Sequence, residues 1–395
     1  MLSGPNSFPR AVLDTNPEPL TLFRHPEALG ALGSTTVLSG SLVPTLEAIL
    51  IKAEAPQLLK NCEYQIYLFF SFLFFFCYFS LNLDMDGRPR YGLQQVFPAD
   101  RAGASRTTFD IVAIHGLGTT APRTWEYKLP GAPGNVVNWL ADGDMLPRRF
   151  PGARIHTYTW NADYLEDAPT QSLLGEANKL LMHVSDLVER GPRPIIFIAS
   201  CFGGLLLAEA LTRAGQYRNP YRNVLLSTAG IVFLGTPFRG SDASQQAEWQ
   251  TIVAGVMGDR PSKQLVQALK ESDPQLRKLT QTFAELAGDD SLRLPAVCFY
   301  EKRKTEMLKK VFSSAVANGV SPVLGGKTYK FLVTEDSACL DTFPRRGLDK
   351  THSGMNKFSG PDSPDFMLVC DAIGGLVNGA PELLKRRVAA NGSWF

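Results

Sequence analysis

The sequence has few cysteines, few histidines and almost no net charge, and each shortage excludes a class of protein. Its six cysteines are scattered without a C-x-x-C pair, which excludes a disulfide scaffold and predicts neither a metal site nor a dithiol redox cofactor. Forty Lys and Arg against 38 Asp and Glu leave a formal net charge of +2, so bulk charge does not favour a nucleic-acid partner. Hydrophobic residues make up 44% of the 395 residues, which is enough for a large folded core.

The N-terminal part differs from the remainder in its hydrophobic pattern. Residues 1–63 lack regular hydrophobic periodicity and begin without the apolar stretch of a secretory signal, so we expect a poorly structured extension. Residues 64–83 read YQIYLFFSFLFFFCYFSLNL, an uncharged run that as a helix would span roughly 30 Å, the thickness of one bilayer core. The sequence therefore predicts a transmembrane segment here. Two alternatives stay open, because a translated intron in a faulty gene model and a soluble core segment would give a similar composition.

From Tyr91 onward, short β-rich runs alternate with helical runs, as in repeated βα units with a mostly parallel sheet. The clearest helix covers 170–190, where leucine, alanine and valine recur every three or four residues. A second helical stretch at 244–286 is too long for a simple crossover and predicts a cap or lid. The expected strands are Gly92–Phe97, Phe109–His115, Arg154–Thr159, Ile195–Ser200, Gly230–Gly235, Pro295–Tyr300 and Tyr329–Thr334.

One strand runs directly into a helix through a small-residue turn, PIIFIASCFGGLLLAEAL, which is the context of a nucleophile elbow. The positions two before and two after the nucleophile press together in such a turn, so both must be small. Cys201 satisfies this with Ala199 and Gly203, whereas Ser200 would place an isoleucine and a phenylalanine there. The helix that follows would lower the pKa of the thiol through its dipole. The alternative is an ordinary buried thiol.

A thiol nucleophile needs a base, and a carboxylate to orient that base. In α/β hydrolases these follow the nucleophile in the order acid, then histidine. His352 is the one histidine of five that lies after Cys201, and it stands in a polar loop near the end of the chain. Glu301, directly after a predicted strand, is the first choice for the acid. Glu335 and Asp336, after a later strand, are the alternatives.

An oxyanion hole takes backbone N–H groups from the residue after the nucleophile and from the loop after an earlier strand. The first of these is Phe202. The strand expected at 109–115 ends in the glycine-rich HGLGTT, where the backbone can approach a substrate oxygen closely. We therefore expect Leu117 and Gly118 to supply the second donor.

These motifs, taken in order, resemble the α/β-hydrolase domain of lipase-like proteins: HGLGTT, ARIHTYTW, IASCFGG, GTPFRGS, CFYE and THSGMNKF. They are most similar to the serine active-site-containing protein family, to GPI inositol-deacylases and to hydrolase domains that precede NACHT or repeat regions in fungal proteins. The resemblance implies an α/β-hydrolase domain over 91–378, with a helical insertion after GTPFRGS and a tail at 379–395. It also implies ester or lipid substrates and membranes of the endoplasmic reticulum or mitochondrion.

The chain departs from the family pattern at the elbow, because Cys201 replaces the usual serine and Ser200 replaces a histidine. Phe238 likewise stands where the GTPFRGS motif often has histidine. We expect a hydrolase of ester or thioester bonds in lipid-like substrates that uses a Cys-His-Glu triad. A catalytically silent signalling or interaction module of the same fold is the alternative, and a scaffold anchored through 64–83 is a third reading. The expected location is an intracellular membrane, or the cytosol if 64–83 is an artefact.

Overall fold

The computed structural model describes residues 91–98, 107–117, 119–131, 134–162, 173–190, 193–240, 274–310 and 324–391. The N-terminal extension, the predicted transmembrane segment at 64–83, Gly118 and much of the expected insertion at 244–286 lie outside the described residues. The predictions made for them stay predictions.

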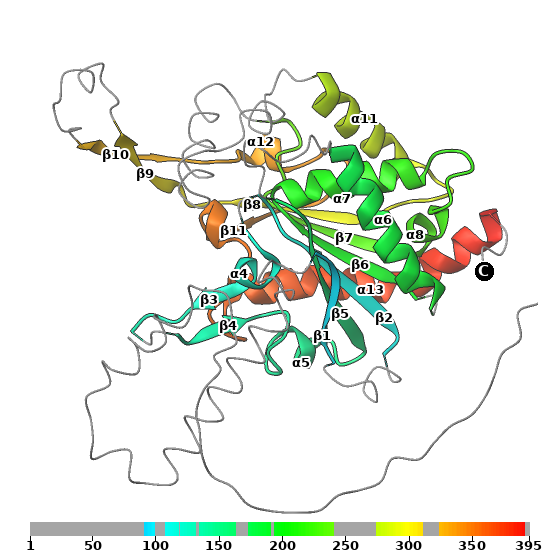
Figure 1. Ribbon diagram of the computed structural model, residues 1–395, viewed down its shortest axis with the longest axis horizontal. Coiled ribbons are helices and arrows are strands. Elements are labelled where there is room, and N and C mark those ends of the chain that lie inside the picture. The colour runs from blue at the N-terminus through cyan, green and yellow to red at the C-terminus, as the bar shows by residue number, and fades with distance from the viewer. Residues whose placement is uncertain are drawn as a thin grey trace, which may run out of the picture. The chain divides into compact units, whose positions relative to one another are not determined.

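A seven-stranded sheet forms the centre of the described part (Figure 1). Neighbouring strands are parallel, except that the edge strand β1 runs antiparallel to β5. The middle strands are buried along their whole length, which explains their unbroken apolar runs. In sheet order the strands are β1 (Gly92–Phe97), β5 (Ala153–Thr159), β2 (Phe109–Ile114), β6 (Ile195–Ser200), β7 (Thr228–Leu234), β8 (Ala296–Glu301) and β11 (Arg345–Leu348).

Helices cover both faces of this sheet, and alternate residues of each strand pack against one face or the other. Val112 and Ile114 of β2 face the cluster beneath α6, α7, α8 and α11. Ile111 and Ala113 face the cluster beneath α13. The helices are α4 (Ala121–Thr124), α5 (Leu146–Arg149), α6 (Leu173–Glu189), α7 (Phe202–Ala214), α8 (Arg222–Ser227), α11 (Pro274–Gly288), α12 (Glu335–Ala338), η3 (His352–Gly354) and α13 (Pro364–Asn391).

Two hairpins lie outside the main sheet, and one of them corrects a prediction. β3 (Glu126–Lys128) pairs with β4 (Val136–Asn138), and β9 (Thr305–Lys310) pairs with β10 (Leu324–Lys330). The strand expected at Tyr329–Thr334 is therefore wrong, because β10 ends at Lys330 and belongs to a separate hairpin. The main sheet ends instead on β11, a short RRGL segment whose parallel pairing with β8 makes it a strand.

The C-terminal helix α13 continues well past residue 378, where the sequence suggested the start of a tail. Arg387 in this extension is buried, and its guanidinium donates to the carbonyl oxygens of Leu226 at 2.8 Å, Thr228 at 2.7 Å and Arg293 at 2.8 Å. Among the described residues, α13 also meets the length and hydropathy of a membrane span. Since its residues Phe366, Val369, Ile373 and Leu376 pack in the cluster beneath the sheet, we assign α13 to the core.

Candidate active site

The turn at Cys201 has the backbone of a nucleophile elbow. Cys201 stands between the end of β6 and the start of α7 with φ 53° and ψ −127°, a conformation that costs a non-glycine residue energy. Its N–H donates to the Leu234 carbonyl oxygen at 2.8 Å, which fixes the turn against the end of β7. A Cβ on Gly203 would overlap the His115 carbonyl oxygen, so the small residue expected there is required. Ala199 is fully buried.

Ser200, the alternative nucleophile, is engaged elsewhere. Its Oγ receives a hydrogen bond of 2.9 Å from Nδ2 of Asn356, and it shares strand parity with Ile198, which packs beneath α13. The backbone carbonyl oxygen of Asn356 accepts a 2.9 Å hydrogen bond from Nε1 of Trp139. These contacts connect the elbow to the segment that carries His352.

Two of the three predicted oxyanion donors lie beside the Cys201 sulfur. The backbone N–H groups of Phe202 and Leu117 both favour the charged form of the thiol, and each lowers its pKa. The glycine-rich loop lies against the same side chain, because a Cβ on Gly116 would be 2.7 Å from Cβ and 3.4 Å from Sγ of Cys201. Gly118, the third predicted donor, lies outside the described residues.

The expected depression of the Cys201 pKa is wrong. Burial of the thiol, which is 8% exposed, raises its pKa to about 12 in spite of the opposing influence of the Phe202 and Leu117 N–H groups. The nearby Glu301 carboxylate acts in the same direction as burial. The resting sulfur therefore carries its proton at neutral pH, and a base must remove that proton during attack.

Glu301 ends β8 as a buried carboxylate beside the segment of His352. Its Oε1 accepts hydrogen bonds from the backbone N–H groups of Leu332 at 2.6 Å and Val333 at 2.8 Å. Burial raises the pKa of Glu301 to about 7, although these two bonds and the backbone N–H of His352 lower it. The carboxylate thus titrates near neutrality.

The alternative acids are placed differently. Glu335 and Asp336 are exposed on α12, where their carboxylates lie 4.0 Å and 3.5 Å from Arg345. They were predicted at the end of a strand that the structure does not contain. Their charges are neutralised at the surface, which leaves Glu301 as the buried carboxylate among the three.

The His352 ring is packed close to the elbow. A Cβ on Gly235 would lie 3.0 Å from Cε1 and 3.2 Å from Nδ1 of His352. Gly235 directly follows Leu234, whose carbonyl oxygen accepts the hydrogen bond from the Cys201 N–H. Gly235 has φ +63°, which glycine adopts without strain. The ring nitrogens are shielded from solvent, and burial lowers the pKa of His352 to about 4. The ring is thus neutral at physiological pH.

Sequence reasoning missed the residues that surround these groups. His115, Trp160 and Asn356 all lie within motifs quoted above, but the patterns gave no sign of their contacts. Their hydrogen bonds join segments separated by 45 and 156 positions in the chain.

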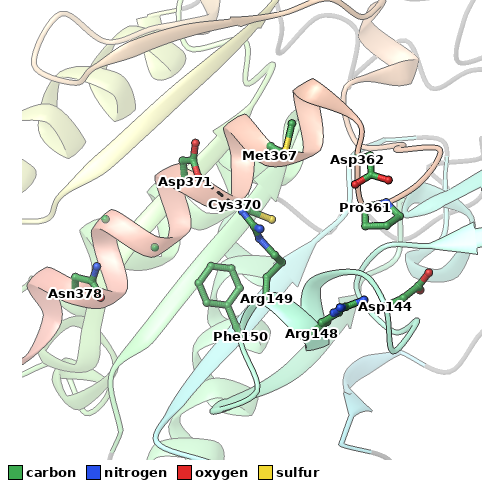
Figure 2. A pocket seen from close by; sticks show the side chains of 12 residues that line it. Asp144, Arg148, Arg149, Phe150, Pro361, Asp362, Met367, Cys370, Asp371 and Asn378 are labelled. Atoms are coloured by element: carbon green, nitrogen blue, oxygen red, sulfur yellow. Dashed lines mark ion pairs between the residues drawn. The ribbon is translucent and has the colours of Figure 1, made fainter.

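A separate cavity of about 840 Å³ lies between α5 and α13 (Figure 2). Arg149 reaches across it toward Asp371, 4.0 Å away. None of the predicted catalytic residues lines this cavity. Because α5 precedes the start of β5 while the elbow follows the end of β6, the cavity and the elbow belong to opposite ends of the sheet.

The sheet order, the helices on both faces and the elbow after β6 define the α/β-hydrolase fold, which confirms the fold class expected from the sequence. The chain is 28% identical to Protein SERAC1 of Danio rerio over 232 residues, which is 54% of this chain and 34% of that protein. It is 25% identical to Protein SERAC1 of Bos taurus over 200 residues, 47% of this chain and 29% of that protein. The chain thus spans about a third of the length of the curated relatives it matches.

Among solved structures, the mature lipase BlEst2 of Bacillus licheniformis has a TM-score of 0.44 and 17% identity, covering 70% of this chain and 97% of that one. No family model matches the chain.

Proposed function

We propose that this chain is a hydrolase that cleaves ester or thioester bonds of lipid-like substrates through an acyl intermediate on Cys201. The observation that carries the proposal is the position of the sulfur, on a strained turn with the N–H groups of Leu117 and Phe202 beside it. Donors so placed stabilise the oxyanion that forms when a nucleophile attacks a carbonyl. A cysteine that only fills the core needs neither the positive φ nor the two donors.

The pKa values set the resting protonation states, a protonated Cys201 thiol and a neutral His352 ring, and the proposed proton movements start from these states. The Cys201 thiol, with its pKa raised to about 12, gives its proton to the neutral His352 ring as the sulfur attacks the carbonyl carbon. The tetrahedral intermediate then collapses, and His352 returns the proton to the departing alcohol or thiol. Water, with His352 again as base, attacks the thioester, releases the acid and restores the Cys201 thiol.

Glu301 is the proposed acid of the triad. Its charged form would stabilise the His352 imidazolium that forms during each half of the reaction. Since burial raises the pKa of Glu301 to about 7, this charge develops as the pH rises through neutrality. The exposed Glu335 and Asp336 suit the role less well, because both face Arg345.

Features outside the elbow suggest the substrate class and the location. The motif resemblance to lipase-like proteins supports a lipid substrate, and the apolar run at 64–83 supports a membrane location, for which the endoplasmic reticulum and mitochondrion are the proposed compartments. Sequencing the transcript across codons 60–90 tests the membrane part separately. If that stretch is spliced out, the cytosol becomes the proposed location and the anchored scaffold is rejected, while the hydrolase proposal stands.

An acyl probe that reacts with thiols tests the hydrolase proposal. We expect it to label the wild-type chain and the Cys298→Ala variant, whose cysteine is buried in β8, but not the Cys201→Ala variant. Equal labelling of both variants would contradict the proposal.

A catalytically silent module is a second candidate, favoured by the low exposure of Cys201 and by the backbone groups that already occupy Oε1 of Glu301. It predicts no turnover on a panel of p-nitrophenyl esters and alkyl thioesters, and a cellular phenotype that Cys201→Ala does not change. Turnover that disappears in Cys201→Ala would reject it.

A further inference from the structure

Trp160 lies between the two segments that supply the N–H donors beside Cys201. It directly follows β5 and is 2% exposed. Its indole stacks on the His115 ring, with centroids 5.6 Å apart and planes inclined by 18°. It also stacks on the Phe202 ring, at 6.0 Å and 22°. One side chain therefore packs against both segments.

Hydrogen bonds hold His115 in a single orientation and protonation state. The indole Nε1–H of Trp160 donates to the His115 carbonyl oxygen at 2.8 Å, and the Trp160 backbone N–H donates to Nε2 of the imidazole at 3.2 Å. Because Nε2 accepts, the ring proton is on Nδ1, which donates to the Gly116 carbonyl oxygen at 2.8 Å. Burial lowers the pKa of His115 to about 4, so the ring stays neutral.

The Gly116–Leu117 peptide links the hydrogen-bonded pair of Trp160 and His115 to the thiol. A peptide unit is planar, so its C=O and N–H point in opposite directions. The C=O is held by His115, and the Leu117 N–H on the opposite edge of the peptide lowers the pKa of the Cys201 thiol, against which Gly116 packs. A rotation of this peptide would break both contacts together.

We infer that Trp160 is a positioning residue of the oxyanion hole, orienting the Leu117 N–H through His115 and the Phe202 N–H through ring stacking. The inference rests on the proposed acyl transfer at Cys201. It differs from simple core packing, because a packing role would affect every reaction of the sulfur equally.

Two reactions of the same sulfur separate these roles. Acylation by p-nitrophenyl butanoate develops an oxyanion at the carbonyl, whereas alkylation by iodoacetamide occurs at a saturated carbon and develops none. Both need the Cys201 sulfur to be accessible and to lose its proton. The ratio of the two rate constants therefore reports oxyanion stabilisation, and changes in thiol pKa or access cancel.

The test variant is Trp160→Phe, which keeps an aromatic ring and removes the Nε1–H. We expect the rate constant of acylation to fall about ten- to hundredfold. This loss is no larger than the one caused by removing an oxyanion donor itself. Alkylation should stay within about twofold, as expected for a thiol whose access is unchanged. The matched control is Trp125→Phe, a buried tryptophan whose Nε1 has no hydrogen-bond partner in the described part of the chain. Both of its rates should match the wild type.

The outcomes are distinct. If the wild type is alkylated but never acylated at Cys201, the proposed function fails and this inference with it. If the wild type is acylated and Trp160→Phe leaves the ratio unchanged, only the role of Trp160 is refuted. If Trp160→Phe does not fold, His115→Phe is measured instead, because it breaks the bond to Gly116 while leaving Trp160 in place. An unchanged ratio there equally refutes the inference.

Discussion

Replacing Arg387 with methionine should strongly destabilise the domain. The side chain is 1% exposed, and its guanidinium donates to the carbonyl oxygens of Leu226, Thr228 and Arg293 at 2.7–2.8 Å. Hydrogen bonds from a charged donor contribute about 1.5–3 kcal/mol each. Burial lowers the pKa of Arg387 to about 10, a desolvation cost that offsets roughly 3 kcal/mol of this gain. We therefore expect Arg387→Met to reduce the free energy of unfolding by about 3 kcal/mol.

Urea denaturation followed by circular dichroism measures this change. Arg386→Met is the matched control, because the neighbouring Arg386 is exposed and pairs with Glu382 across one helical turn at 3.1 Å. That pair should contribute no more than about 0.5 kcal/mol. A loss below about 1 kcal/mol for Arg387→Met, or equal losses for both variants, would refute the assignment of the C-terminal end of α13 to the folded domain.

Two further predictions concern the site. The rate of Cys201 acylation should rise as the pH increases through about 7, because Glu301 then becomes charged. Glu301→Gln should lower the rate and remove this inflection from a pH profile measured by stopped flow. An inflection that persists in the variant would show that another group titrates. Gly203→Ala should lower acylation at least tenfold and destabilise the fold by about 1–3 kcal/mol, since its Cβ would overlap the His115 carbonyl oxygen. The control Gly375→Ala, with open space around it in α13, should leave the rate unchanged and raise the urea midpoint slightly, because alanine favours a helix over glycine.

The elbow and the central strands could be predicted because their signals are local. Ala199 and Gly203 flank one cysteine within five positions, and β2, β6 and β7 are continuous apolar runs bounded by turns. Strand β11 could not be predicted in the same way, because RRGL has little β pattern and depends on pairing with β8.

The pKa values and hydrogen bonds of the site could not be predicted from the sequence. A helix start after Cys201 suggested a lowered pKa, but burial raises the pKa by more than the backbone N–H groups of Phe202 and Leu117 lower it. The hydrogen-bonded residues Trp160 and His115 are 45 positions apart, and hydrophobic periodicity does not indicate contacts between residues that far apart in the sequence. Side-chain hydrogen bonds of this kind become visible only once the fold brings their partners together.

The most direct test of the account is the chemical identity of the trapped acyl group. The wild-type chain is quenched during reaction with p-nitrophenyl butanoate, digested and fragmented by mass spectrometry. A butanoyl group on the Cys201 sulfur, removed by neutral hydroxylamine as a thioester should be, is the predicted result. Acylation of the neighbouring Ser200, stable to hydroxylamine, or no adduct in this peptide would contradict it.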